Sequence, residues 1–518
     1  MKARTIKFCS DKKDWLIAIV LFFVTVISRI PDRSHFLYSW DSGNFALGIS
    51  HFNPAAHQPH PPGYPLYILA GKILNLVSNN ANTSLVVISI ISASISVSLI
   101  YGAGCRIFNR NTGLVAAILL FASPLIWFQS EVALAHIVEL PFAVLGTWLL
   151  YEVFFNRRYA FTAAVVIGLG CGFRQDVFMF YGPILFIASF RLGDTRKMLA
   201  VWAMMLVSVL VWLVPFLYLV GDLSTYRLVS SNHSQMAFQD AFWNKGIAGI
   251  FKNGKAALLS ALWLLGTATI PLVFLCARMV YVKTVRQDRR IWFFLSLAIL
   301  PVTFFIATSF SHYGYGLIYS PSLMLLPAFP MPMMVETVKP MPNQEKLIMM
   351  CALIPLAGGI TLAPLPRPED LGNKLRYSFG ECSHSGIKKT DNEMSAVIDR
   401  INQYNPDETL VVFMGKGEDP MYFRQSIYYL PEYRILWLRP DTASRYHEAK
   451  GGSEIEPADN LKISLSIQYK KMLVFYMGEE ISGKPLQPVG GINVSLIDLN
   501  QQNTKLGPYV FQYMEREG

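Results

Sequence analysis

The sequence predicts an all-α polytopic membrane protein in residues 1–363, followed by a soluble α/β domain in residues 364–518. Hydrophobic residues make up 53% of the 518-residue chain and charged residues 15%, whereas a soluble domain carries roughly 25% charge. Apolar runs close to the ~20 residues that cross a bilayer recur through residues 1–363 and then stop. These two observations fix the fold class.

The apolar runs predict about eleven transmembrane helices. In chain order they are 14–30, 84–104, 113–130, 136–155, 159–173, 177–190, 199–220, 256–281, 291–309, 318–336 and 346–363. One further run, 62–78 (PPGYPLYILAGKILNLV), begins with two prolines and is short. Whether this run crosses the membrane decides the orientation of every segment after it.

The distribution of basic residues settles that orientation. If 62–78 does not cross, the cytoplasmic loops are 105–111, 156–158, 191–197, 283–290 and 338–346, and all of them are basic. If it crosses, all of them lie outside, against the preference of Lys and Arg for the cytoplasmic side. We therefore expect 62–78 to be a helix in the outer membrane interface, with the N-terminus cytoplasmic and the C-terminal domain extracytoplasmic. The net charge of +10 comes mostly from these loops and does not indicate nucleic-acid binding.

The C-terminal part shows alternating helix and strand patterns. Residues 391–405 (DNEMSAVIDRINQYN) predict an amphipathic helix capped by its first Asp. Four apolar segments predict buried strands, at 408–415, 433–438, 472–478 and 492–499. This alternation is typical of a small α/β sandwich. No glycine-rich phosphate loop follows any of these strands.

The stretch between the first two predicted spans carries an unusual set of polar residues. Asp41 lies in YSWDSGN just past the first span, and a rigid Pro61-Pro62 turn follows. Prolines reduce loop entropy, so this loop is suited to holding a carboxylate in place as a general base. The alternative is a helix-capping or interfacial acid. His57 and His60 are not spaced as in a standard zinc site. No cofactor is therefore predicted firmly, although a divalent metal ion stays open as a cofactor.

Two further segments on the predicted outer face carry ionisable groups. FQSEVALAHIVELPFA contains Glu131 and Glu139, and ionisable groups near a membrane interior are functional candidates. Glu131 is the better one because it adjoins the turn. The alternative for each is an interfacial acid that faces water. GFRQD contains Arg174, whose guanidinium suits phosphate oxygens. The alternative for Arg174 is an ion pair with Asp176 or with an acid on another span.

A third segment on this face, SHYGYG, contains His312 and Tyr315. Both side chains are candidate hydrogen-bond donors to a lipid phosphate. Anchoring in the aromatic belt of the membrane interface is the alternative for the tyrosine.

These residues together resemble the GT-C superfamily of membrane glycosyltransferases, in particular its dolichyl-phosphate-mannose protein mannosyltransferase-like group. The match is Asp41 followed by HPPGYPLY at 60–67, supported more weakly by SEVALAHIVE and GFRQD, and it covers about residues 10–340. The resemblance implies a helical bundle with interfacial helices in the first outer loop. It also implies transfer of a sugar from a polyprenyl-phosphate donor to a glycan, lipid or protein acceptor on the extracytoplasmic face, with inversion.

The resemblance assigns a role to each candidate residue. Asp41 matches the family's catalytic acid, but many members carry two adjacent acids there and Ser42 follows Asp41 here. The second carboxylate must therefore come from elsewhere, and we choose Glu131. The expected donor-phosphate ligands are Arg174, His60, Tyr315 and His312, and the expected substrate-binding residues are His57, Tyr64 and Gln175.

Two other functions remain as alternatives. A transporter or flippase of polyprenyl-linked glycans should carry polar groups on broken helices near mid-membrane, often in internal repeats. A sensor would use the α/β domain for its ligand and the spans as an anchor. The polar groups gather on one face, no repeat is visible, and the spans are too many for anchoring, so we favour the enzyme. The absence of a visible eukaryotic sorting signal favours a bacterial inner membrane.

Overall fold

The computed structural model describes residues 12–310, 312–330, 384–415, 422–439, 446–451, 453–458, 461–476, 481, 483–489, 491–499 and 503–513. The chain divides into two compact units. The helical unit comprises Met1–Arg33, Tyr64–Leu74 and Ser84–Gly386, and the α/β unit comprises Ser34–Gly63, Asn75–Thr83 and Ile387–Gly518. The predicted boundary at 363/364 lies outside the described residues. The segments 34–63 and 75–83 belong with the C-terminal part, which the sequence did not indicate.

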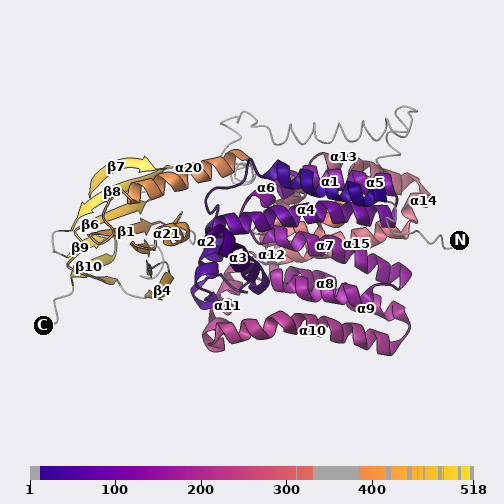
Figure 1. Cartoon of the computed structure of the whole chain (residues 1–518), viewed down its shortest axis with the longest axis horizontal. Coiled ribbons are helices and arrows are strands. Elements are labelled where there is room, and N and C mark those ends of the chain that lie inside the picture. The colour runs from indigo at the N-terminus through magenta and orange to yellow at the C-terminus, as the bar shows by residue number, and fades with distance from the viewer. Residues whose placement is uncertain are drawn as a thin grey trace. The chain divides into compact units, whose positions relative to one another are not determined.

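The helical unit is built from helices, several of which are long and apolar and run side by side (Figure 1). Their bounds are α1 Lys12–Arg29, α3 Pro65–Ser78, α4 Ala81–Ile107, α5 Arg110–Ala122, α6 Pro124–Glu131, α7 His136–Tyr151, α8 Ala160–Phe173, α9 Asp176–Ser189, α10 Thr195–Val220, α11 Leu223–Ala237, α12 Phe242–Leu265, α13 Thr269–Tyr281, α14 Lys283–Arg286, α15 Arg289–Ala307 and α16 Ser320–Ala328. A 3-10 segment, η5, covers Tyr313–Tyr319, and a π-helical turn, Glu152–Asn156, extends α7.

Within the described residues, four helices are long and apolar enough to cross a membrane, and two bent pairs raise the number to six. The predicted single span 113–130 is bent by 57° between α5 and α6, where Pro124 starts the second helix. The predicted span 256–281 is bent by 107° between α12 and α13, after Gly266 adopts a φ of +50°. Residues 331–336 of the span 318–336 and the whole of 346–363 lie outside the described residues.

Close helix contacts and apolar outer surfaces characterise the helical unit. A Cβ on Gly104 of α4 would lie 2.5 Å from the Cα of Gly113 on α5, so only glycine permits this approach. Large apolar side chains such as Trp15, Ile27 and Val211 are about half exposed or more. Apolar side chains exposed in such number indicate a surface that contacts something other than water, as the predicted bilayer does.

The α/β unit contains a seven-stranded mixed sheet in the order β4-β3-β2-β1-β6-β8-β7 and a three-stranded sheet in the order β5-β10-β9. The strands are β1 Thr409–Met414, β2 Arg434–Leu438, β3 Tyr446–Lys450, β4 Ser453–Ala458, β5 Lys462–Leu465, β6 Lys471–Tyr476, β7 Lys484–Val489, β8 Ile492–Asp498, β9 Thr504–Leu506 and β10 Tyr509–Tyr513. The four predicted strands are the central β1, β2, β6 and β8. The outer strands were missed because they are partly polar, and β7 (KPLQPV) contains two prolines.

Two helices of the α/β unit contribute side chains to the same core cluster as the large sheet. Helix α20 spans His384–Ile401 and α21 spans Phe423–Tyr429. The prediction that Asp391 caps a helix was wrong, because α20 begins seven residues earlier and Asp391 lies within it. From the first loop, α2 (Trp40–Ser50) and the 3-10 turn η1 (Pro54–Ala56) join this unit, and Leu47 of α2 adds to the same cluster.

Candidate active site

Asp41 lies in the first turn of α2, and the local sequence explains why the helix starts there. Ser39 is the N-cap, with a φ of −138°, and it forms a capping box with Ser42. The Ser42 amide donates to Ser39 Oγ over 3.3 Å and the Ser39 amide donates to Ser42 Oγ over 3.3 Å. Ser42 therefore has a structural role in starting the helix. The Asp41 side chain is 37% exposed, so its carboxylate is accessible although its backbone is fixed.

His60 approaches Asp41 from the proline-rich turn. Its Nδ1 lies 3.6 Å from Asp41 Oδ1 and 3.5 Å from Asn44 Nδ2, and its ring lies 5.4 Å from that of Phe45. The turn is packed tightly on α2, because a Cβ on Gly48 would lie 2.7 Å from Pro59. A separation of 3.6 Å is longer than a hydrogen bond, so His60 and Asp41 are neighbours that are not hydrogen-bonded in this structure.

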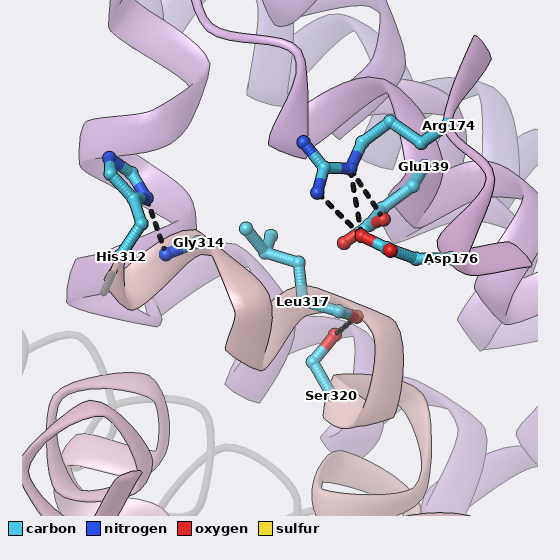
Figure 2. A network of polar contacts seen from close by, with 7 residues as sticks. All are labelled: Glu139, Arg174, Asp176, His312, Gly314, Leu317 and Ser320. Carbon is cyan, nitrogen blue, oxygen red and sulfur yellow. Dashed lines mark hydrogen bonds and ion pairs between the residues drawn. The ribbon is translucent and has the colours of Figure 1, made fainter. Parts of the chain in front are cut away.

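Arg174 is held by two carboxylates in the helical unit (Figure 2). It is the C-cap of α8. Its Nε donates to Glu139 Oε2 over 3.0 Å and to Asp176 Oδ2 over 3.2 Å, and its Nη2 donates to Asp176 Oδ2 over 2.5 Å. Glu139 belongs to the first turn of α7 and Asp176 begins α9. The sequence left this ion pairing open as the alternative to phosphate binding, and the structure contains it.

Glu139, Arg174 and Asp176 form a triad whose charges do not balance. Two carboxylates and one guanidinium give a formal charge of −1 when all three groups are ionised. Glu139 is fully buried, and its Oε1 has no hydrogen-bond partner among the described residues. The third guanidinium nitrogen of Arg174 points away from both acids (Figure 2). The Tyr64 ring centre lies 5.9 Å from Arg174 Cζ, so this predicted substrate-binding residue adjoins the triad.

Two histidines far apart in sequence stack in the same unit. The rings of His136 on α7 and His312 lie 4.3 Å apart at an angle of 9°, and Tyr315 meets His136 edge-on at 5.3 Å. The Gly314 amide donates to His312 Nδ1 over 3.0 Å (Figure 2). An amide always donates, so Nδ1 is unprotonated and the ring proton of His312 resides on Nε2.

Glu131 is enclosed by aromatic and basic side chains. It is 1% exposed, and Trp127 Nε1 donates to its Oε1 over 2.7 Å. Arg29, also buried, lies over the Trp127 ring with Cζ 3.5 Å from the ring centre and donates to Ser130 Oγ over 3.3 Å. These partners compete with the predicted role of Glu131 as a second catalytic carboxylate, which stays a prediction.

Two predicted substrate-binding residues remain, His57 and Gln175, and Gln175 stands between Arg174 and Asp176 in the sequence. His57 follows η1 with a φ of 57° in the α/β unit. Gln175 is the exposed N-cap residue of α9. Within the described part of the chain, no group of three or more His, Cys, Asp or Glu side chains could hold a metal ion.

Sequence reasoning missed Arg29 and the stacking of His136 on His312. Arg29 closes the first apolar run, and a charged residue there was a usable signal. The two histidines had no local signal, because they lie in separate segments. For Arg174 the sequence left an acid on another span open as a partner, without identifying it as Glu139.

Comparisons with known proteins agree with this architecture. A family model described as dolichyl-phosphate-mannose-protein mannosyltransferase matches residues 59–219. The structure of ArnT from Cupriavidus metallidurans in the apo state is 11% identical, with a TM-score of 0.51, over 93% of this chain and 97% of that one. The structure of the same protein bound to undecaprenyl phosphate is 12% identical, with a TM-score of 0.49, over 86% and 97%.

A more distant likeness is to the Archaeoglobus fulgidus oligosaccharyltransferase tethered with an acceptor peptide, which is 13% identical, with a TM-score of 0.46, over 82% of this chain and 64% of that one. No curated protein matches the sequence. The likeness to ArnT shows a shared fold. The stretch matched by the family model contains both the proline-rich turn at 60–62 and GFRQD at 172–176.

Proposed function

We propose that this protein transfers a sugar from a polyprenyl-phosphate donor to an acceptor hydroxyl on the extracytoplasmic face of the membrane. The acceptor oxygen attacks the anomeric carbon from the side opposite the phosphate. The bond between the anomeric carbon and the phosphate oxygen breaks, polyprenyl phosphate leaves with the bonding electrons, and Asp41 takes the hydroxyl proton. The configuration at the anomeric carbon is inverted.

The observation that carries this proposal is the placement of Asp41. Its carboxylate is 37% exposed, while the capping box fixes the backbone and His60 lies 3.6 Å away. A general base must reach its proton through a hydrogen bond or a single water, which requires both access and a fixed position. The buried acids of the helical unit, Glu131 and Glu139, lack such access.

The donor phosphate needs hydrogen-bond donors that strengthen as its negative charge grows. His312 offers its Nε2 proton, and Tyr315 adjoins it. Arg174 offers the nitrogen that points away from Glu139 and Asp176 (Figure 2). We assign donor binding to these three residues and to His60, with Tyr64, His57 and Gln175 as substrate contacts. The undecaprenyl phosphate bound to ArnT from Cupriavidus metallidurans is the class of lipid that we propose here.

Contacts inside the α/β unit support the predicted orientation of α3. Asn82 Nδ2 donates to the Ser34 carbonyl over 3.1 Å, and the Ala81 amide donates to the Tyr428 hydroxyl over 2.8 Å. The segments before and after α3 therefore belong to one folded unit, and a folded unit lies on one side of a membrane. A single crossing by α3 would separate them, which supports the proposal that α3 begins and ends on the same side. The basic loops favour the extracytoplasmic side for both ends.

The test is transfer by the purified protein in liposomes, with a panel of radiolabelled polyprenyl-phosphate sugars and an extract of envelope lipids and glycans. The proposal predicts release of polyprenyl phosphate and labelling of an acceptor with at least one donor. Movement of intact donor between leaflets without bond cleavage would instead support the flippase. Absence of both transfer and hydrolysis with every donor would contradict the enzyme.

A further inference from the structure

The stretch that leads to Asp41 is held by a single carboxylate from α20. Asp391 accepts three hydrogen bonds: its Oδ2 from the His35 amide over 2.9 Å, and its Oδ1 from the Phe36 amide over 3.0 Å and from Ser34 Oγ over 3.2 Å. Asp391 is 9% exposed. These contacts join residues that are more than 350 positions apart in sequence. Hydrogen bonds to a charged acceptor are roughly twice as strong as neutral ones.

A second anchor lies one residue further along the chain. The Leu37 amide donates to the Tyr429 hydroxyl over 2.9 Å, and the Phe36 ring packs edge-on against Tyr429 at 5.4 Å. Burial raises the pKa of Tyr429, so its hydroxyl stays neutral. Leu37 is fully buried. Three consecutive backbone amides, at residues 35, 36 and 37, are thus all bonded to side chains of the C-terminal α/β domain.

The turn of α2 that contains Asp41 packs directly on α21. The Trp40 ring lies 4.8 Å from Arg424 Cζ and stacks on Phe423 at 6.3 Å. A Cβ on Gly43 would lie 2.7 Å from Arg424 Cβ and 3.2 Å from the Arg424 carbonyl carbon, so the α2 backbone touches α21 at this point. Arg424 is 2% exposed and also donates to the Ala56 carbonyl over 3.4 Å.

We propose that Asp391, Tyr429 and Arg424 are positioning residues for Asp41, so that the C-terminal α/β domain is part of the catalytic apparatus. Trp40 and Gly43 flank Asp41 and fix its helical turn against α21, while Asp391 and Tyr429 fix the chain before it. A displacement of about 1 Å at a reacting group can cost roughly 10²-fold in rate. The inference deepens the proposed function and depends on it for its kinetic readout.

The test compares Asp391→Ala and Tyr429→Phe with Asp399→Ala. Asp399 lies on the same helix, is exposed, and accepts from Ser395 Oγ at 3.5 Å. We expect Asp391→Ala to lower kcat by about 10–100-fold while the KM for the donor changes less than about twofold, and Asp391→Glu to recover part of the loss. Tyr429→Phe removes one acceptor and keeps the ring, so it should fold even if Asp391→Ala does not, and it should lower kcat severalfold. Asp399→Ala should match the wild type.

Hydrogen exchange supplies a readout that does not need activity. Amide exchange in a peptide covering residues 33–44 should accelerate in Asp391→Ala and Tyr429→Phe and stay unchanged in Asp399→Ala. Faster exchange with unchanged kcat would overturn the positioning role, as would a lower kcat with unchanged exchange. If the wild-type protein transfers no sugar, the proposed function is contradicted instead. Hydrogen exchange would then still report whether residues 33–44 are held by Asp391 and Tyr429.

Discussion

The buried triad of Glu139, Arg174 and Asp176 allows a prediction about stability from charge balance. Arg174 and Glu139 are 7% and 0% exposed, and the Asp176 side chain is 15% exposed. Replacing Arg174 by Gln leaves two buried carboxylates without a cation, and removal of one partner of a buried pair costs about 3–5 kcal/mol. Replacing Glu139 by Gln leaves Arg174 paired one-to-one with Asp176 and removes the excess negative charge.

The two neutralising substitutions should therefore differ. We expect Arg174→Gln to destabilise the protein by about 3–5 kcal/mol. We expect Glu139→Gln to destabilise it by about 1 kcal/mol or less, since the amide oxygen still accepts from Arg174 Nε and loss of the excess charge offsets the weaker hydrogen bond. Thermal unfolding of the purified variants in detergent, followed by intrinsic fluorescence, gives the order of the midpoints. Equal midpoints for the two variants, or a lower one for Glu139→Gln, would refute the reasoning.

Three further predictions address other parts of the structure. Trp127→Phe removes the donor to buried Glu131 and should cost about 1–3 kcal/mol, whereas Trp292→Phe, at a residue 53% exposed, should leave the unfolding midpoint nearly unchanged. Gly314→Ala places a Cβ 2.3 Å from His136 Cγ and should lower the free energy of unfolding by about 1–3 kcal/mol. Gly254→Ala, with nothing within 4 Å of its Cβ, is the control. Equal unfolding midpoints for the two variants would contradict the packing of Gly314 against His136. Single cysteines at Thr83 and Lys389, in a variant whose six native cysteines are serines, should both react with an impermeant maleimide in intact cells; labelling only after permeabilisation would reverse the topology.

The sequence predicted the elements whose signals are local. Apolar runs located the helices of the bundle, and apolar strands located β1, β2, β6 and β8 in the middle of the sheet. The break at Gly266 was missed because one glycine in an apolar run carries no clear signal for a bend. Strand β7, with two prolines at the edge of the sheet, was missed because its stability comes from pairing with β8, which lies outside any sequence window.

The contacts of the candidate site were likewise predictable only between residues that are close in sequence. Asp41 and His60 were predicted together because one short segment contains both. The partners of Arg174 were foreseen only in part, since Asp176 is two residues away whereas Glu139 is 35 residues away. The anchoring of Ser34, His35 and Phe36 by Asp391 spans most of the chain, and a single sequence holds no information on such a pairing.

The central claim is that the Asp41 carboxylate activates the acceptor. Its most direct test is the rate of sugar transfer by Asp41→Asn in liposomes, at saturating donor, beside Asp32→Asn as a matched control with 39% side-chain exposure. A general base contributes about 10²–10⁴-fold. We expect Asp41→Asn to lose transfer by at least the lower factor, about 100-fold, with unchanged abundance and unfolding midpoint, while Asp32→Asn keeps its rate. A rate for Asp41→Asn equal to that of the control would contradict the claim.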